Sequence, residues 1–231
     1  MRYALYFTPS EDDPLTRRAA AWIGRDAYTN RRIAQTLAEG VSADLLKAAT
    51  ASPRRYGFHA TLKAPFRLAD GESEDDLMSC LTAFCERARP FELGPLAVAR
   101  LGRFYALMQT TPGARLASFA GELVELFDRF RAPLADDEIV RRNPEDLTER
   151  QRQYLRRWGY PYVFDEFRFH MTLTGSLDEV DAALLEPALK ACFAPVLGKP
   201  VPVTAVTLFV ESKPGEPFVV AARVPLAGAE G

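Results

Sequence analysis

The chain has 231 residues, of which 48% are hydrophobic and 26% are charged, so it can bury enough apolar surface to fold without a partner. Its formal charge of -2 argues against a protein that mainly coats nucleic acid, because such binding depends on neutralising phosphates with a basic surface. These values predict one compact globular domain, or two small lobes that share a core, and leave room for a local basic cleft.

The cysteine content and the hydropathy pattern indicate where the protein works. Cys80, Cys85 and Cys192 are an odd number without metal-like clustering, which suits a reducing compartment better than a disulfide framework. No apolar run approaches the ~20 residues of a membrane helix, and the opening M-R-Y-A-L-Y-F does not resemble a secretion signal. We therefore expect a cytoplasmic protein that does not bind membranes.

Helix and strand patterns alternate along the chain, without repeats of solenoid length. In chain order they predict a strand over 2–8, helices over 15–23, 42–50 and 73–88, strands over 91–98 and 101–110, a helix over 116–130, a helix from 148, a helix over 177–193, and a hairpin of strands 203–210 and 218–224. Asp13-Pro14 is expected to start the first helix and Gly24 to end it. Ser73, with Asp76 three residues later, is expected to start the third.

Residues 131–160 differ from the rest because they are polar and rich in arginine, and we interpret them as a helical insertion between core elements. Thr148 and Gln151 have the spacing of a capping box. The helix that follows would bury Tyr154, Leu155 and Trp158 and expose Arg150, Arg152, Arg156 and Arg157. Such arginines are typical of a solvated helix face, and the alternative is a lid that faces phosphate.

The two histidines of the chain, His59 and His170, lie in the same five-residue pattern, F-H-x-T-L, at residues 58–62 and 169–173. Alternation along a strand puts the apolar side chains on one face, and each histidine on the other face beside Thr61 or Thr172. One such histidine is more often a hydrogen-bonded core residue than a catalyst. The repetition of the whole pattern favours a shared function.

Neighbouring residues join this face when positions are counted in steps of two. Lys63 falls on the side of His59, whereas Arg168 and Thr174 fall on the side of His170. Lys63 and Arg168 are therefore candidates for substrate binding. The alternative is an ordinary surface role, because long basic side chains also end in solvent.

Two histidines with hydroxyl and cationic neighbours suit chemistry at a phosphodiester. A neutral imidazole can accept a proton from the attacking oxygen while a protonated one donates to the leaving oxygen, and a pKa of ~6.5 allows both forms near neutrality. Threonine hydroxyls and cations can stabilise the developing charge on the phosphoryl oxygens. Two histidines and two threonines are a poor donor set for zinc, so we expect no metal and no other cofactor.

The paired H-x-T-L motifs resemble those of the two-histidine (2H) phosphoesterase superfamily, which includes 2′-5′ RNA ligase-like and cyclic phosphodiesterase proteins. The strings at 56–63 (Y-G-F-H-A-T-L-K), 158–164 (W-G-Y-P-Y-V-F) and 167–170 (F-R-F-H) also resemble a narrower bacterial branch associated with phosphonate use. This similarity covers most of the chain. It implies one α+β domain over residues 1–231 with two pseudo-symmetric lobes, each an antiparallel sheet with helices outside, which face each other across a cleft that holds one motif from each lobe.

The resemblance to the narrower branch implies a substrate, a small phosphorylated ribose that carries a 1,2-cyclic phosphate. Strand parity adds Tyr6, Arg103 and Tyr105 as candidate substrate contacts, with partly exposed sheet residues as the alternative. A second phosphate on the substrate would need further cations, for which Lys63, Arg103 and Arg168 are candidates.

Two other functions stay open. An RNA or nucleotide 2′,3′-cyclic phosphodiesterase or 2′-5′ ligase would use the same chemistry but needs a longer basic or aromatic groove, and the acidic overall charge disfavours it. A non-catalytic nucleotide-binding module would be favoured by loss of a histidine or threonine, and both pairs are intact. The expected ligand is thus a phosphorylated sugar or a nucleotide.

Overall fold

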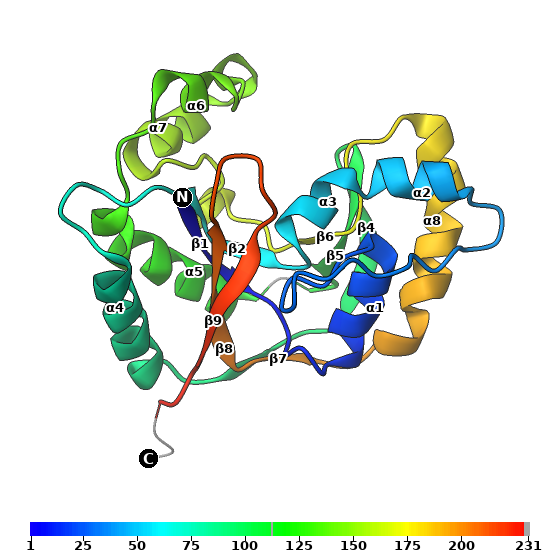
Figure 1. The fold of residues 1–231 in the computed structure, drawn as a ribbon, viewed down its shortest axis with the longest axis horizontal. Helices are drawn as coiled ribbons and strands as arrows, with labels where there is room; N and C mark the ends of the chain where they lie inside the picture. The colour runs from blue at the N-terminus through cyan, green and yellow to red at the C-terminus, as the bar shows by residue number, and fades with distance from the viewer. Residues whose placement is uncertain (112, 229–231) are drawn as a thin grey trace.

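A computed structural model describes residues 1–111 and 113–228, which form an α+β fold with antiparallel sheets. The largest sheet has four strands in the order β2-β1-β8-β9, and each neighbouring pair is antiparallel (Figure 1). Its strands are β1 (Arg2–Phe7), β2 (Ala60–Phe66), β8 (Ala205–Glu211) and β9 (Val219–Pro225). The first and last parts of the chain therefore build one sheet together.

Two smaller antiparallel sheets complete the strand pairing of the described residues. One has the order β4-β5-β6, and the other pairs β3 with β7. Their strands are β3 (Phe91–Leu93), β4 (Leu96–Leu101), β5 (Phe104–Gln109), β6 (Met171–Thr172) and β7 (Val201–Val203). The two histidine motifs thus belong to different sheets, with one beside β2 and the other beside β6.

Helices surround these sheets. They are α1 (Pro14–Ile23), α2 (Ala43–Ala49), α3 (Ala51–Tyr56), α4 (Glu74–Arg87), α5 (Ala114–Leu126), α6 (Asp136–Val140), α7 (Glu149–Trp158) and α8 (Glu179–Phe193). Short 3-10 turns lie at Asp128–Phe130, Pro144–Asp146, Phe164–Glu166 and Ala194–Val196. In Figure 1, α4 and α5 lie on the left and α1, α2 and α8 on the right, while α6 and α7 stand above the main body.

The four-stranded sheet has one helix-covered face and one face that is available for a site. Leu5 and Leu208 belong to the main core, on the side where α4 and α5 pack. Tyr6 and Phe209 point to the other face and join a smaller apolar cluster with Phe218. Tyr6 therefore lies on the face of the sheet that points away from α4 and α5.

Local signals placed several helix ends correctly. The Asp13 carboxylate accepts a hydrogen bond from the backbone N–H of Leu15, and Gly24 ends α1 in the left-handed conformation with φ = 82°. Thr148 and Gln151 form the predicted capping box of α7. These short-range interactions are encoded in neighbouring residues, which is why the sequence reveals them.

Several predicted boundaries are wrong. The strand expected over 203–210 is interrupted at Thr204, which separates β7 from β8. The strand expected over 91–98 is broken at Gly94-Pro95, so that β3 joins β7 while β4 joins β5. The strand expected over 101–110 starts only at Phe104, because Gly102, with φ = 59°, and Arg103 form the turn between β4 and β5. The helix expected to reach Phe130 ends at Leu126 and is followed by a 3-10 turn.

Candidate active site

Both histidine rings are held in the same way, by a hydrogen bond from the ring to the backbone two residues earlier. Nδ1 of His59 lies 2.9 Å from the carbonyl oxygen of Gly57, and Nδ1 of His170 lies 2.8 Å from that of Arg168. Because a carbonyl oxygen can only accept, each Nδ1 carries the proton. In the neutral ring, Nε2 of both histidines is left as a base.

The backbone before His59 requires a glycine. Gly57 has φ = 79°, and a Cβ atom on it would lie 2.6 Å from Cβ of Ala27. This conformation is strained for any residue with a side chain. Gly57 therefore fixes the carbonyl that orients the His59 ring.

His59 lines a cavity of about 260 Å³ that also receives the threonine of each motif. The described lining consists of Arg2, Tyr6, Ser52, Pro53, Tyr56, Gly57, His59, Thr61, Ala64, Pro65, Arg142, Tyr160 and Thr172. Thr61 Oγ1 lies 3.3 Å from Nε2 of His59. Thr172 comes from β6, so the cavity brings together residues of both motifs from two different sheets.

The environment disfavours the protonated form of both rings. Burial, together with the nearby charge of His170, lowers the pKa of His59 from 6.5 to about 4. Burial likewise lowers the pKa of His170. His170 itself is not among the residues that line the described cavity, although Thr172 of the same motif is. An anion bound beside either ring would favour its protonated form.

Tyr6, a candidate substrate contact from strand parity, lines the cavity and contacts His59 directly. Its ring stacks on the His59 ring with centroids 3.7 Å apart and an interplanar angle of 19°. The Tyr6 side chain is 1% exposed, and burial raises its pKa well above 10. The tyrosine therefore stays neutral and holds one face of the His59 ring.

Lys63 does not share the face of His59, so this prediction from strand parity is wrong. Tyr6 pairs with Thr61, whereas the preceding residue Leu5 pairs with Lys63. One step along β1 thus matches two steps along β2, which shows a bulge in β2 between Thr61 and Lys63. Opposite residues of an antiparallel pair point to the same face, so Lys63 turns with Leu5 towards the core. Lys63 Nζ donates to the carbonyl of Val124 at 3.1 Å and lies 3.3 Å from Asp128 Oδ1. Ala64 takes the place in the cavity wall that parity had given to Lys63.

The two neighbours predicted for His170 have structural contacts. Arg168 has an exposed side chain and contributes its carbonyl oxygen to the orientation of His170. Thr174 is fully buried, accepts the N–H of Tyr105 at 2.9 Å, and donates to the carbonyl of Gly175. Neither side chain is among those that line the cavity.

Arg103 and Tyr105 also lie outside the cavity wall. Arg103 is exposed in the β4–β5 turn and donates to the carbonyl of Leu177 at 3.3 Å. Tyr105 is buried, and its hydroxyl donates to Glu186 of α8 at 2.9 Å. Parity failed here because the strand begins after Arg103, and the face of Tyr105 is covered by a helix.

Nine of the described lining residues were not predicted from the sequence, among them Arg2, Tyr56, Arg142 and Tyr160. Arg2 shares the strand face of Tyr6, so parity could have identified it. Arg142 lies in the 131–160 segment, six residues before Thr148, where no periodic pattern indicates a direction. The arginines of α7 behave as a solvated helix face, since Arg150 pairs with Asp165 at 2.6 Å and Arg152 with Glu149 at 3.1 Å.

The described residues hold no group of three or more histidine, cysteine, aspartate or glutamate side chains with the arrangement of a metal site. Within residues 1–111 and 113–228, every helix is too short or too polar to cross a bilayer.

Comparisons with solved structures give weak similarity over nearly the full chain. The crystal structure of TT0787 of Thermus thermophilus covers 99% of both chains at 17% identity with a TM-score of 0.49. A structure described as "Crystal structure of phosphoesterase" covers 97% of both at 13% identity, with a TM-score of 0.45. E. coli LigT complexed with NADP+ covers 98% of both at 12% identity, with a TM-score of 0.43.

Sequence comparison gives stronger similarity. A protein of Janthinobacterium sp. (strain Marseille) named "Ribose 1,5-bisphosphate phosphokinase PhnN" is 40% identical over 98% of this chain and 51% of its own length. A protein of the same name from Laribacter hongkongensis (strain HLHK9) is 39% identical over 94% of this chain and 50% of its length. The chain thus spans about half the length of these relatives. Residues 61–219 match a family model, and the chain therefore belongs to the family described as "Protein of unknown function (DUF1045)".

Proposed function

We propose that this protein is a two-histidine phosphoesterase that opens a cyclic phosphate of a small phosphorylated ribose without a metal ion. The observation that carries the proposal is the cavity in which His59 and Thr61 of one motif meet Thr172 of the other, two residues after His170. Two imidazoles with free Nε2 atoms and two hydroxyls are the groups that such a reaction needs. In this proposal the four-stranded and three-stranded sheets are the cores of two lobes within one domain, and each lobe supplies one histidine.

The electrostatics suggest a division of labour between the histidines. His59 has the strongly lowered pKa of about 4, so we assign it as the general base. His170 would become protonated when the anionic substrate binds, and would act as the general acid. Water loses a proton to His59 Nε2 as its oxygen bonds to phosphorus, the ring P–O bond breaks, and the leaving ribose oxygen receives the proton of His170.

The threonines would stabilise charge in this step. Thr61 lies close to His59 Nε2, and Thr172 lines the same cavity from β6. Each hydroxyl can donate to a non-bridging phosphoryl oxygen as negative charge develops there.

The names of the relatives support a ribose phosphate as the substrate class. Both relatives are named for phosphorylation of a ribose bisphosphate and are about twice as long as the region that matches this chain. The sequence has no G-x-x-x-x-G-K-[S/T] loop, the motif that binds the phosphates of a nucleoside triphosphate. We therefore infer that this region contributes a separate step on a related phosphorylated ribose, in keeping with the resemblance to the branch associated with phosphonate use.

The size of the cavity favours a small substrate. A volume of about 260 Å³ is below the usual range for sites that enclose drug-sized ligands, which starts at roughly 300 Å³. An oligonucleotide would need a longer groove with further stacking surfaces.

A substrate screen tests the proposal. The purified protein should be incubated with ribose 1,2-cyclic phosphates, nucleoside 2′,3′-cyclic phosphates and 2′-5′-linked dinucleotides, and products followed by phosphorus NMR. We expect ring opening of a ribose cyclic phosphate that disappears in both the His59→Ala and the His170→Ala proteins. Turnover confined to the 2′-5′ dinucleotides would replace this proposal by the RNA-processing alternative. Turnover that persists in both folded variants would contradict the two-histidine mechanism.

A further inference from the structure

One end of the cavity carries an excess of positive charge. Arg2 and Arg55 both pair with Glu211, each at 2.5 Å, so a single buried carboxylate serves two guanidinium groups. Arg142 lines the same cavity and adds a third cation beside Arg2. The described residues at this end therefore hold more positive than negative charge.

Arg142 is half-buried, yet the described part of the chain provides no hydrogen bond or ion pair for its guanidinium. Its described contact is with the Tyr160 ring, whose centroid lies 5.2 Å from the guanidinium carbon. Glu138, a carboxylate whose charge acts on Arg142, is bonded to Arg67 at 3.1 Å and to the backbone N–H of Ala135 at 2.9 Å. A partly buried cation with unused donors is costly unless a ligand compensates it.

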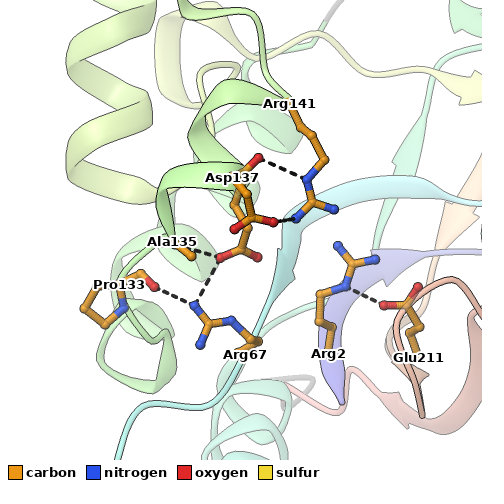
Figure 2. A network of polar contacts seen from close by, with 8 residues as sticks. Arg2, Arg67, Pro133, Ala135, Asp137, Arg141 and Glu211 are labelled. Carbon is orange, nitrogen blue, oxygen red and sulfur yellow. Dashed lines mark hydrogen bonds and ion pairs between the residues drawn. The ribbon is translucent and has the colours of Figure 1, made fainter.

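The anchoring of α6 explains how this arginine reaches the cavity. Arg67, which follows β2, donates to Glu138 and also to the carbonyl of Pro133 at 2.8 Å (Figure 2). These bonds fasten the start of the 131–160 segment to the end of β2, next to Arg2. Arg142 lies two residues after the end of α6, so the segment brings a cation to the cavity wall.

We propose that Arg142 and Arg2 form a second anion site, which binds a phosphate monoester on the same sugar whose cyclic phosphate lies between the histidines. The identity of the sugar rests on the proposed function, whereas the anion site rests on the arginines. A guanidinium offers a planar set of donors that matches phosphate oxygens, and the phenol of Tyr160 adds another. Burial raises the pKa of Tyr160 to about 12, so its hydroxyl keeps the proton that it would donate.

Arg2 lies along β1 from the histidine end of the cavity. Arg2 and Tyr6 lie on the same face of β1, four residues and thus roughly 13 Å apart along the strand. Tyr6 stacks on His59, while the Arg2 side chain lines the same small cavity. A ligand held at His59 can therefore meet Arg2 and Arg142 further along the same cavity wall.

The test compares Arg142→Gln with Arg141→Gln, a control at the adjacent residue. Arg141 is exposed and already paired with Asp137 at 2.7 Å (Figure 2). The kcat/KM of parent and variants should be measured on ribose 1,2-cyclic phosphate with and without a 5-phosphate. We expect Arg142→Gln to lose about 10- to 100-fold on the 5-phosphorylated substrate, as for removal of a charge-assisted contact, and less than about 3-fold on the other. Arg141→Gln should resemble the parent on both.

A binding measurement separates failure of this inference from failure of the proposed function. Calorimetry with ribose 5-phosphate and with unphosphorylated ribose needs no turnover. Weaker binding of ribose 5-phosphate to Arg142→Gln than to the parent and Arg141→Gln would support the anion site even if no cyclic phosphate is hydrolysed. Equal binding by all three proteins, or equal losses by Arg142→Gln on the two cyclic substrates, would overturn it.

Discussion

Replacing Lys63 by methionine distinguishes a structural role for this lysine from a role in substrate binding. Lys63 is 3% exposed and bonds to the carbonyl of Val124 and to Asp128, away from the cavity wall. Methionine has a similar length and no charge. If Lys63 bound a substrate phosphate, its loss would cost about 10- to 100-fold in kcat/KM, the effect of removing a charge-assisted hydrogen bond. With the contacts it has, we expect a change of less than about 3-fold.

The stability of this variant can be worked out from the pKa of the lysine. Burial lowers the pKa of Lys63 from 10.5 to about 8, so the unfolded chain binds a proton more tightly than the folded one. The parent's free energy of unfolding should therefore rise with pH between about 8 and 10.5, by roughly 3 kcal/mol in total. Below pH 8 the burial of the charged lysine lowers the free energy of unfolding of the parent, and Asp128 keeps its pairing with Arg131 in the variant. We therefore expect Lys63→Met to lose at most about 1 kcal/mol of stability relative to the parent.

Urea unfolding at several pH values, together with kcat/KM, measures both effects. The parent should gain stability relative to Lys63→Met as the pH rises from 8 to 10.5. A large loss of kcat/KM with unchanged stability would show that Lys63 reaches the substrate, and would refute its assignment to the core.

Three further predictions concern the chemistry. Replacing Thr61 or Thr172 by valine should lower kcat/KM about 10- to 1,000-fold with little movement of the pH profile, and replacement by serine should restore part of the lost efficiency. Full efficiency in either valine variant would contradict a role in charge stabilisation. Activity should survive exhaustive chelation, because the chemistry assigned to the histidines needs no Lewis acid; abolition by EDTA with recovery on one divalent ion would overturn this point. The pH profile of kcat/KM should be bell-shaped, because it falls below about pH 4 as His59 becomes protonated and falls again at higher pH as His170, with a pKa below 6.5, loses its proton. The maximum of kcat should lie at higher pH than that of kcat/KM, because bound phosphate favours the imidazolium form. A kcat/KM maximum above pH 8 would contradict the assignment of the two histidines.

The parts of the site that the sequence predicts are those set by local pattern. The F-H-x-T-L repeats single out His59, Thr61 and Thr172, which line the cavity, because a strand alternates its side chains between two faces. The same rule fails at Lys63, since one bulge in β2 reverses the faces beyond Thr61, and nothing in residues 60–66 announces the bulge. Parity is therefore informative close to the motif and loses value with each further step along the strand.

Other features depend on contacts between distant segments. Arg142 reaches the cavity because Arg67 and Glu138, 71 residues apart, fasten its segment to β2. Tyr105 leaves the site because its hydroxyl meets Glu186, 81 residues later. The sequence shows that such residues are present, but only the folded chain decides which partner each one meets.

The most direct test of the account is the turnover of the His59→Ala, His170→Ala and double-alanine proteins on the ribose cyclic phosphate, with urea unfolding to verify that each is folded. Each single variant should lose roughly 100-fold or more, and the double variant should be little worse than either single one, because the two rings act on one transition state. A folded single variant with turnover close to that of the parent would contradict the two-histidine mechanism.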